Sequence, residues 1–104
     1  MGLFDLFSKK PDINETVGDL GGKVLLDVRE PDEFAAGHIP GSVNTPVSDI
    51  ASAEKYIDGP DTPVYVYCLT GARSGRAVRF LRSRGYTNVT NIGGITSYRG
   101  RLEK

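Results

Sequence analysis

The single cysteine of this chain, Cys68, stands where an apolar stretch meets a glycine-containing loop. The loop is Leu69-Thr70-Gly71-Ala72-Arg73, and a helix is predicted to follow it. Consecutive backbone N–H groups in such a loop can converge on an anion, and the helix N-terminus adds a partial positive charge. With the charge of Arg73, these groups lower a cysteine pKa from about 8.5 to roughly 3.5–7.5. The pattern predicts that Cys68 is a nucleophile at an anion-binding loop.

Each of these residues also has a plainer interpretation. Most free cysteines are small buried hydrophobes, and Arg73 alternatively forms a salt bridge at the start of the helix. Gly71 favours the interpretation of Cys68 as a nucleophile, because a glycine here supplies a positive φ or a close backbone approach. Asp27, Arg29 and Glu30 suggest either acid–base chemistry or a buried ion-pair network that braces the loop, and the network is favoured.

Alternating strands and helices must position these residues. Strands are predicted at residues 24–28, 42–45, 64–67 and 88–92, with Gly93-Gly94 ending the last one. Helices are predicted at residues 12–20, 31–36, 48–57 with Ser48 as N-cap, 74–84, and from about 95 to the end. This alternation indicates an α/β fold with a mostly parallel central sheet and helices on both faces. Ligands of such sheets bind beyond the carboxyl ends of the strands, where Cys68 lies.

Composition limits the class of protein. A chain of 104 residues fits one domain, and we expect an N-terminal extension at residues 1–11 before a domain at 12–104. Thirteen basic residues balance thirteen acidic ones, so neither nucleic acid nor a membrane is an expected partner. The extension is expected to pack on its own domain or fray, the alternative being a weak amphipathic contact with a membrane or partner. A lone cysteine favours a reducing, cytoplasmic location, and no ligand set for a metal and no cofactor is expected.

Three longer motifs resemble a known family. They are Leu26-Asp27-Val28-Arg29-Glu30-Pro31-Asp32-Glu33-Phe34, then Gly37-His38-Ile39-Pro40-Gly41-Ser42-Val43-Asn44, and Asn91-Ile92-Gly93-Gly94-Ile95. From about Asp12 to its end, the chain resembles the single-domain rhodaneses, which are sulfurtransferases. Tyr98 stands where members often have Trp, a change expected to alter packing. The resemblance implies that His38 lies in a structural turn, with a packing and hydrogen-bonding role in preference to that of a catalytic base.

The resemblance also implies a mechanism. The Cys68 thiolate would attack the outer sulfur of a donor such as thiosulfate, and the resulting persulfide would pass its sulfur to cyanide or a thiol. Backbone N–H groups of residues 69–73 would hold the persulfide. Family members that use thiosulfate often carry a charged residue where this chain has Leu69, which leaves a persulfide donor open. The expected partners are small sulfur donors and acceptors, with a sulfur-carrier protein as a further candidate.

Two other functions compete with sulfur transfer. Related phosphatases of the same architecture separate cysteine and arginine by five residues, to make room for phosphate. Four residues separate Cys68 from Arg73 here, and this tighter loop favours sulfur over a phosphatase or arsenate reductase. The second competitor is a catalytically idle module that binds a partner protein, because fold does not fix function.

Overall fold

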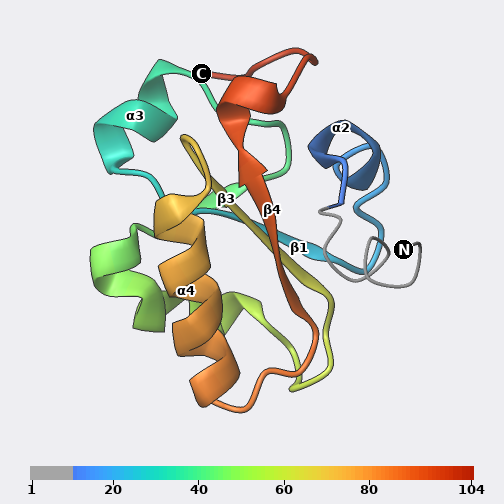
Figure 1. Ribbon diagram of the computed structural model, residues 1–104, viewed down its shortest axis with the longest axis vertical. Helices are drawn as coiled ribbons and strands as arrows, with labels where there is room; N and C mark the ends of the chain where they lie inside the picture. Colours follow the sequence, from blue (N-terminus) through green and yellow to red (C-terminus); the bar gives the residue numbers. More distant parts are fainter. Residues whose placement is uncertain (1–10) are drawn as a thin grey trace, which may run out of the picture.

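A four-stranded sheet forms the centre of the computed structural model, which describes residues 11–104 (Figure 1). The strands are β1 (Val24–Asp27), β2 (Val43–Asn44), β3 (Val64–Cys68) and β4 (Val89–Gly94), in the spatial order β2-β1-β3-β4. Every neighbouring pair is parallel. The predicted α/β fold with a parallel sheet is therefore confirmed.

Successive side chains of a strand point to opposite faces of the sheet. The strands therefore contribute to two hydrophobic clusters, one on each face. Leu26, Val66 and Cys68 belong to the larger cluster, which α4 (Ala72–Ser83) and the 3₁₀ segment η1 (Val47–Tyr56) cover. Leu25 and Tyr67 belong to the smaller cluster, which α2 (Ile13–Thr16) covers. The sheet is thus covered on both faces, with α4 and α2 on opposite sides of β4 in Figure 1.

Two predicted helices differ from the observed ones. Helix α2 ends at Thr16, short of the predicted residue 20, because Val17 and Leu20 reach the smaller cluster from non-helical positions. The segment predicted as a Ser48-capped helix is instead the 3₁₀ segment η1, kinked at Asp49. A 3₁₀ geometry aligns residues three apart, and it buries Ile50 and Ala53 together.

Two more helices, α3 and α4, lie close to their predicted positions. Helix α3 spans Pro31–Ala36, with proline in its first turn. Helix α4 begins at Ala72, two residues before the predicted start, because Gly71 at φ 114° already serves as its N-cap. Gly85 follows the helix at φ 99°, the left-handed conformation common after a helix C-terminus.

The carboxyl end of β4 corrects two further predictions. Gly93 and Gly94 were expected to end this strand, but they pair with Tyr67 and Cys68 as part of it. The register shifts by one residue here, and Gly93 accommodates the bulge at φ 96°. The predicted final helix is only the short η2 (Ile95–Ser97).

The last residues of the chain lie against α3, where backbone hydrogen bonds of 2.8 Å join His38 and Glu103 in both directions. Within residues 11–104, no helix combines the length and apolar character needed to cross a membrane. The predictions for residues 1–10 fall outside the described part of the chain.

Candidate active site

Cys68 is the last residue of β3, and its thiol is enclosed by the loop that follows. The residue is 1% exposed. The Gly71 N–H donates a hydrogen bond to Sγ at 3.0 Å, and the Ser74 hydroxyl lies 3.4 Å from Sγ. The loop and the start of α4 thus place hydrogen-bond donors around the sulfur.

These donors determine the protonation of the thiol. Burial raises the pKa of Cys68, but the Ser74 hydroxyl and the N–H groups of Ser74, Gly71 and Thr70 outweigh burial. The net effect is a pKa below the ordinary cysteine value. Hydrogen bonds to the charged form therefore favour a thiolate at this position.

Two glycines allow the loop to take this shape. Gly71 has φ 114°, a backbone conformation that residues other than glycine rarely adopt. Gly94 lies beneath the loop, where an added Cβ would overlap the carbonyl of Leu69 and the Cα of Thr70. Gly94 pairs with Cys68 in the sheet, so the loop packs directly on the neighbouring strand.

Ser74 and Asn91 form a polar network that the sequence analysis did not identify. The Ser74 Oγ lies 3.0 Å from the Gly71 carbonyl and 2.7 Å from Asn91 Oδ1. Asn91 Nδ2 donates to the same Gly71 carbonyl at 3.0 Å. The available signal was a serine on the inner face of α4, next to Ala77 in the buried stripe.

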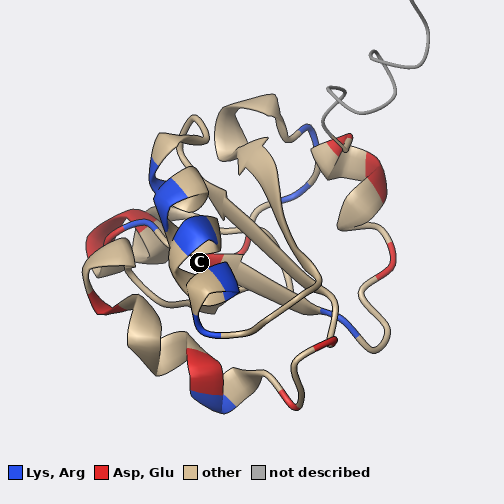
Figure 2. Ribbon diagram, turned by 60° about the horizontal axis from the view of Figure 1, so that its bottom comes forward, with Lys and Arg blue, Asp and Glu red and all other residues tan. Residues whose placement is uncertain are grey.

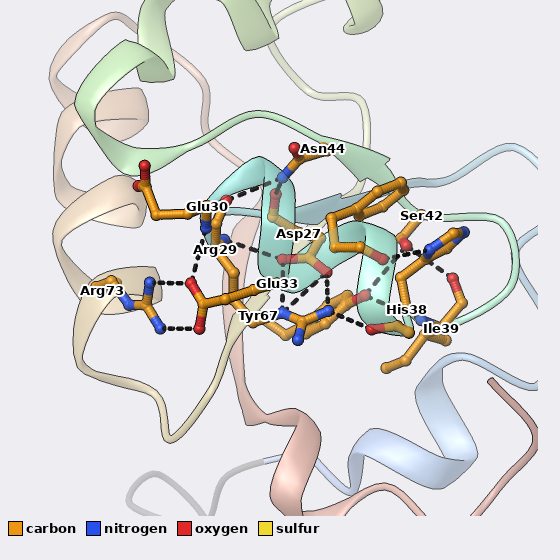
Figure 3. Close-up of polar contacts among 12 residues, drawn as sticks. Asp27, Arg29, Glu30, Glu33, His38, Ile39, Ser42, Asn44, Tyr67 and Arg73 are labelled. Atoms are coloured by element: carbon orange, nitrogen blue, oxygen red, sulfur yellow. Dashed lines mark hydrogen bonds and ion pairs between the residues drawn. The ribbon is translucent and has the colours of Figure 1, made fainter. Parts of the chain in front are cut away.

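Arg73 makes the salt bridge that was its alternative interpretation. Its guanidinium donates to both carboxylate oxygens of Glu33, at 2.7 and 3.0 Å (Figure 3). The hydrogen bond from Arg73 lowers the pKa of Glu33 to about 2. Cys68 also raises the pKa of Arg73 through its charge, which follows Glu33 and burial in importance. Arg73 is therefore near the sulfur, but its positive charge is already paired with the carboxylate of Glu33.

The surroundings of this ion pair carry charges of both signs. Figure 2 shows basic residues gathered along α4 and acidic residues on the neighbouring α3. Glu33 Oε1 also accepts the backbone N–H of Glu30 at 2.8 Å, which ties the start of α3 to the Cys68 loop. The role of Glu33 was not predicted from the sequence, because only the fold brings it to Arg73, forty positions away.

Asp27 and Arg29 form a buried ion pair at the end of β1, next to β3 (Figure 3). The Nε of Arg29 lies 3.0 and 3.1 Å from the two Asp27 oxygens, and Nη2 lies 2.7 Å from Oδ2. The same Nη2 donates to the carbonyl of Gly37 at 2.7 Å. Glu30, expected in this network, is exposed and belongs to the start of α3 instead.

His38 has structural partners in this fold. Its ring stacks on Phe34 with 3.7 Å between centroids, and its Nδ1 lies 2.9 Å from the Phe34 carbonyl. The nearby Tyr67 hydroxyl accepts the Ile39 N–H at 3.1 Å and donates to Ser42 at 3.1 Å. Within residues 11–104, no group of three or more His, Cys, Asp or Glu side chains is arranged to hold a metal ion.

The arrangement around Cys68 is suited to covalent chemistry at sulfur. A stabilised thiolate can attack an electrophilic sulfur, and the same N–H groups can hold an anionic group bonded to Cys68. The structure places Leu69 at the edge of the loop with 41% of its surface exposed.

Comparisons with known proteins agree with this geometry. A family model described as a rhodanese-like domain matches residues 12–101. The uncharacterized protein YqhL of Bacillus subtilis is 44% identical over 80 residues, which cover 76% of this chain and 63% of YqhL. Thiosulfate sulfurtransferase PspE of Escherichia coli is 39% identical over 72 residues, 67% of this chain and 68% of PspE.

Solved structures and other relatives extend the comparison. A structure described as a rhodanese with anions from E. coli aligns with a TM-score of 0.73 and 30% identity. The alignment covers 79% of this chain and 98% of the E. coli chain. Further relatives are named as a sulfurtransferase and as a putative sulfur carrier protein. The chain spans 63% and 50% of the length of YqhL and of that carrier protein, respectively.

Proposed function

The chain belongs to the rhodanese-like domain family, whose members include named sulfurtransferases, and from this premise we propose that it transfers a sulfane sulfur through a Cys68 persulfide. The observation that carries the proposal is the sulfur environment. A buried thiol with a lowered pKa accepts an N–H hydrogen bond at 3.0 Å inside a loop of further donors. That environment favours both the attacking thiolate and an anionic persulfide.

In the first step, the Cys68 thiolate attacks the outer sulfur of a donor. A Cys68–sulfur bond forms as the donor's sulfur–sulfur or sulfur–sulfonate bond breaks. The bonding electrons leave with sulfite, if the donor is thiosulfate, or with a thiolate, if the donor is a persulfide. The N–H groups of Thr70, Gly71 and Ser74 then hold the persulfide, in the manner of an oxyanion hole.

In the second step, cyanide or a thiol takes the outer sulfur and Cys68 leaves as a thiolate. This sequence contains one cysteine, so it holds no second thiol with which the persulfide could form an internal disulfide. The persulfidated enzyme should therefore wait for an external acceptor, which predicts double-displacement kinetics. A sulfur-carrier protein fits the same role as a larger donor or acceptor, and a reducing cytoplasm fits a lone functional thiol.

The loop also supports sulfur transfer over phosphate chemistry. Four residues separate Cys68 and Arg73, and Glu33 engages both arms of the Arg73 guanidinium. A phosphatase needs that guanidinium for the oxygens of its substrate. The matched charge at Arg73 and the exposed Leu69 favour a donor with less charge than thiosulfate, such as a persulfide.

The test treats the purified protein with thiosulfate or a small persulfide, removes the donor, and measures the intact mass. We expect one added sulfur, lost again on addition of cyanide with formation of thiocyanate. Cys68→Ser should neither gain sulfur nor form thiocyanate, because its hydroxyl is a poor nucleophile with no base beside it. Thiocyanate formation by this variant would refute the mechanism, and a wild-type protein that never takes up sulfur would indicate a binding module.

A further inference from the structure

The carbonyl of Leu69, in the loop that encloses Cys68, is held from outside the loop. Strand β4 leads directly into η2 at the carboxyl edge of the sheet (Figure 1). There the Thr96 backbone N–H donates to the Leu69 carbonyl at 3.4 Å, and the Thr96 hydroxyl donates to the same oxygen at 3.2 Å. Thr96 thus connects the sulfur site to a segment that lies 27 positions further along the chain.

The end of β4 leaves the space that this contact needs. Gly94 is the residue before η2 and pairs with Cys68 in the sheet. An added Cβ at Gly94 would overlap the Leu69 carbonyl, so the backbone of the loop lies directly on β4. The Leu69 side chain is exposed, in contrast. The peptide group after Leu69 is therefore fixed, while the side chain remains in contact with solvent.

A fixed carbonyl also fixes the N–H group of the same peptide. A trans peptide is planar, and its C=O and N–H point in opposite directions. Because the Leu69 carbonyl points to Thr96, the Thr70 N–H points away from η2. The sulfur lies on that side, since the Thr70 N–H is among the groups that lower the pKa of Cys68. The next N–H, that of Gly71, donates to Cys68 Sγ at 3.0 Å.

The remainder of the loop has its own anchor. Asn91 Nδ2 donates to the Gly71 carbonyl at 3.0 Å, and the Gly75 N–H donates to the same oxygen at 3.1 Å. Loss of the Thr96 hydroxyl would therefore release one peptide and leave the start of α4 in place. Because Thr96 and Leu69 are both exposed, water can replace the hydroxyl as a donor. A water molecule is not tied to η2, so it satisfies the carbonyl without orienting it.

We propose that Thr96 is a positioning residue of the sulfur site, which holds the Leu69–Thr70 peptide so that its N–H faces the Cys68 sulfur. Thr96 acts on the sulfur through this one peptide group. The proposal deepens the proposed function and rests on it for the persulfide, since the Thr70 N–H is one of the groups that would hold that anion. The effect on the free thiolate can be measured without any transfer of sulfur.

The test compares Thr96→Val, which removes the hydroxyl and keeps the shape, with Thr96→Ser, which keeps the hydroxyl. Thr87→Val is the matched control. Thr87 donates its N–H, at 2.7 Å, and its hydroxyl, at 3.1 Å, to one carbonyl, that of Pro60. Thr87 precedes β4 and so lies at the opposite end of the parallel sheet from Cys68. The two exposed threonines make the same kind of contact, but only that of Thr96 adjoins the sulfur.

The readout is the pH midpoint of alkylation by iodoacetamide, which reports Cys68 alone because the sequence contains one cysteine. Complete loss of one hydrogen bond to a thiolate would raise the midpoint by about one pH unit. In Thr96→Val the Thr70 N–H is misdirected but not removed, so the expected rise is about half a pH unit. Thr96→Ser and Thr87→Val should keep the midpoint of the wild type.

An unchanged midpoint in Thr96→Val would overturn the positioning role. So would a Thr96→Ser variant that behaves like Thr96→Val, because the hydroxyl would then not be the group that matters. An equal rise in Thr87→Val would also overturn it, since it would indicate a general loosening of the fold.

A second measurement separates this proposal from the proposed function. Sulfur uptake from thiosulfate, followed by intact mass, should show the same shift of its pH profile in Thr96→Val. A wild-type protein that takes up no sulfur would refute the proposed function, and the alkylation profiles would still decide the role of Thr96.

Discussion

Ser74→Ala should raise the pKa of the Cys68 thiol while leaving the fold intact. The Ser74 hydroxyl lies 3.4 Å from Sγ and is the strongest of the groups that lower this pKa. Its other partners lose the bond to Ser74 in the variant, but each keeps another hydrogen bond. The Gly71 carbonyl still accepts from Gly75 N–H at 3.1 Å, and Asn91 Oδ1 still accepts from Gly93 N–H at 2.9 Å. Neither of these two acceptors is left unpaired, so the expected destabilisation is about 1 kcal/mol.

The size of the pKa change follows from the geometry. A hydrogen bond to a charged group contributes about 1.5–3 kcal/mol, and one pKa unit corresponds to about 1.4 kcal/mol. The contact is long, and the hydroxyl has competing acceptors in Gly71 and Asn91. The lower end of the range therefore applies, which predicts an increase of about one pKa unit.

The assay is the rate of alkylation by iodoacetamide as a function of pH. The midpoint is the relevant quantity, because a thiolate of higher pKa is also a stronger nucleophile and partly masks the loss of rate at low pH. Ser83→Ala is the matched control on the same helix, since within residues 11–104 the Ser83 hydroxyl bonds only the Phe80 carbonyl. If the profiles of Ser74→Ala and Ser83→Ala coincide, the Ser74 hydroxyl does not stabilise the thiolate and the electrostatic reasoning is wrong.

Three further predictions concern the ion pairs. Glu33→Gln should lower the KM for thiosulfate, because it frees the charge of Arg73, whereas Arg73→Ala should raise this KM. If steady-state kinetics show the KM changing in the same direction in both variants, then Glu33 does not neutralise Arg73 towards the donor. Because Arg73 lowers the Glu33 pKa to about 2, the pair stabilises the folded state above pH ~4.5, and that contribution, about 1 kcal/mol, is lost as pH falls towards 2. Urea unfolding of the wild type should show this acid loss, and Arg73→Ala should show a smaller one, because the Glu30 N–H still lowers the Glu33 pKa. Asp27→Asn should destabilise the protein by about 3–5 kcal/mol, because it leaves Arg29 buried without a counter-charge, whereas Asp58→Asn at an exposed loop position should change urea stability by less than about 0.5 kcal/mol.

The parts of the fold that follow from local patterns were predictable. The apolar run Val64–Tyr67 has no alternative to a buried strand, and Pro31 with Gly37 brackets α3 as the sequence suggests. The failures occurred where tertiary packing outweighs periodicity. Val17 contacts the core without being helical, and Gly93 continues a strand that two glycines were expected to end.

The site was predictable to the extent that it is contiguous in the sequence. Cys68 and its loop lie in one segment, so strand, glycine and helix start together indicated the converging N–H groups. Glu33 and Asn91 come from other segments, and no local pattern distinguishes them from exposed polar residues. Only the parallel sheet, which brings the ends of β1, β3 and β4 to one edge, shows that they contact the loop.

The charge balance at this edge also explains which forces hold the sulfur. Arg73 is matched by Glu33 and Arg29 by Asp27, so neither arginine offers an unmatched positive charge to the Cys68 anion. The Cys68 thiolate is therefore stabilised by N–H dipoles and the Ser74 hydroxyl, which act at hydrogen-bond distance in a buried site. Such short-range interactions are screened by salt far less than exposed charges. Discharge of the persulfide by an uncharged thiol should therefore be nearly independent of ionic strength, and a steep salt dependence would mean that an unmatched surface charge controls the reaction.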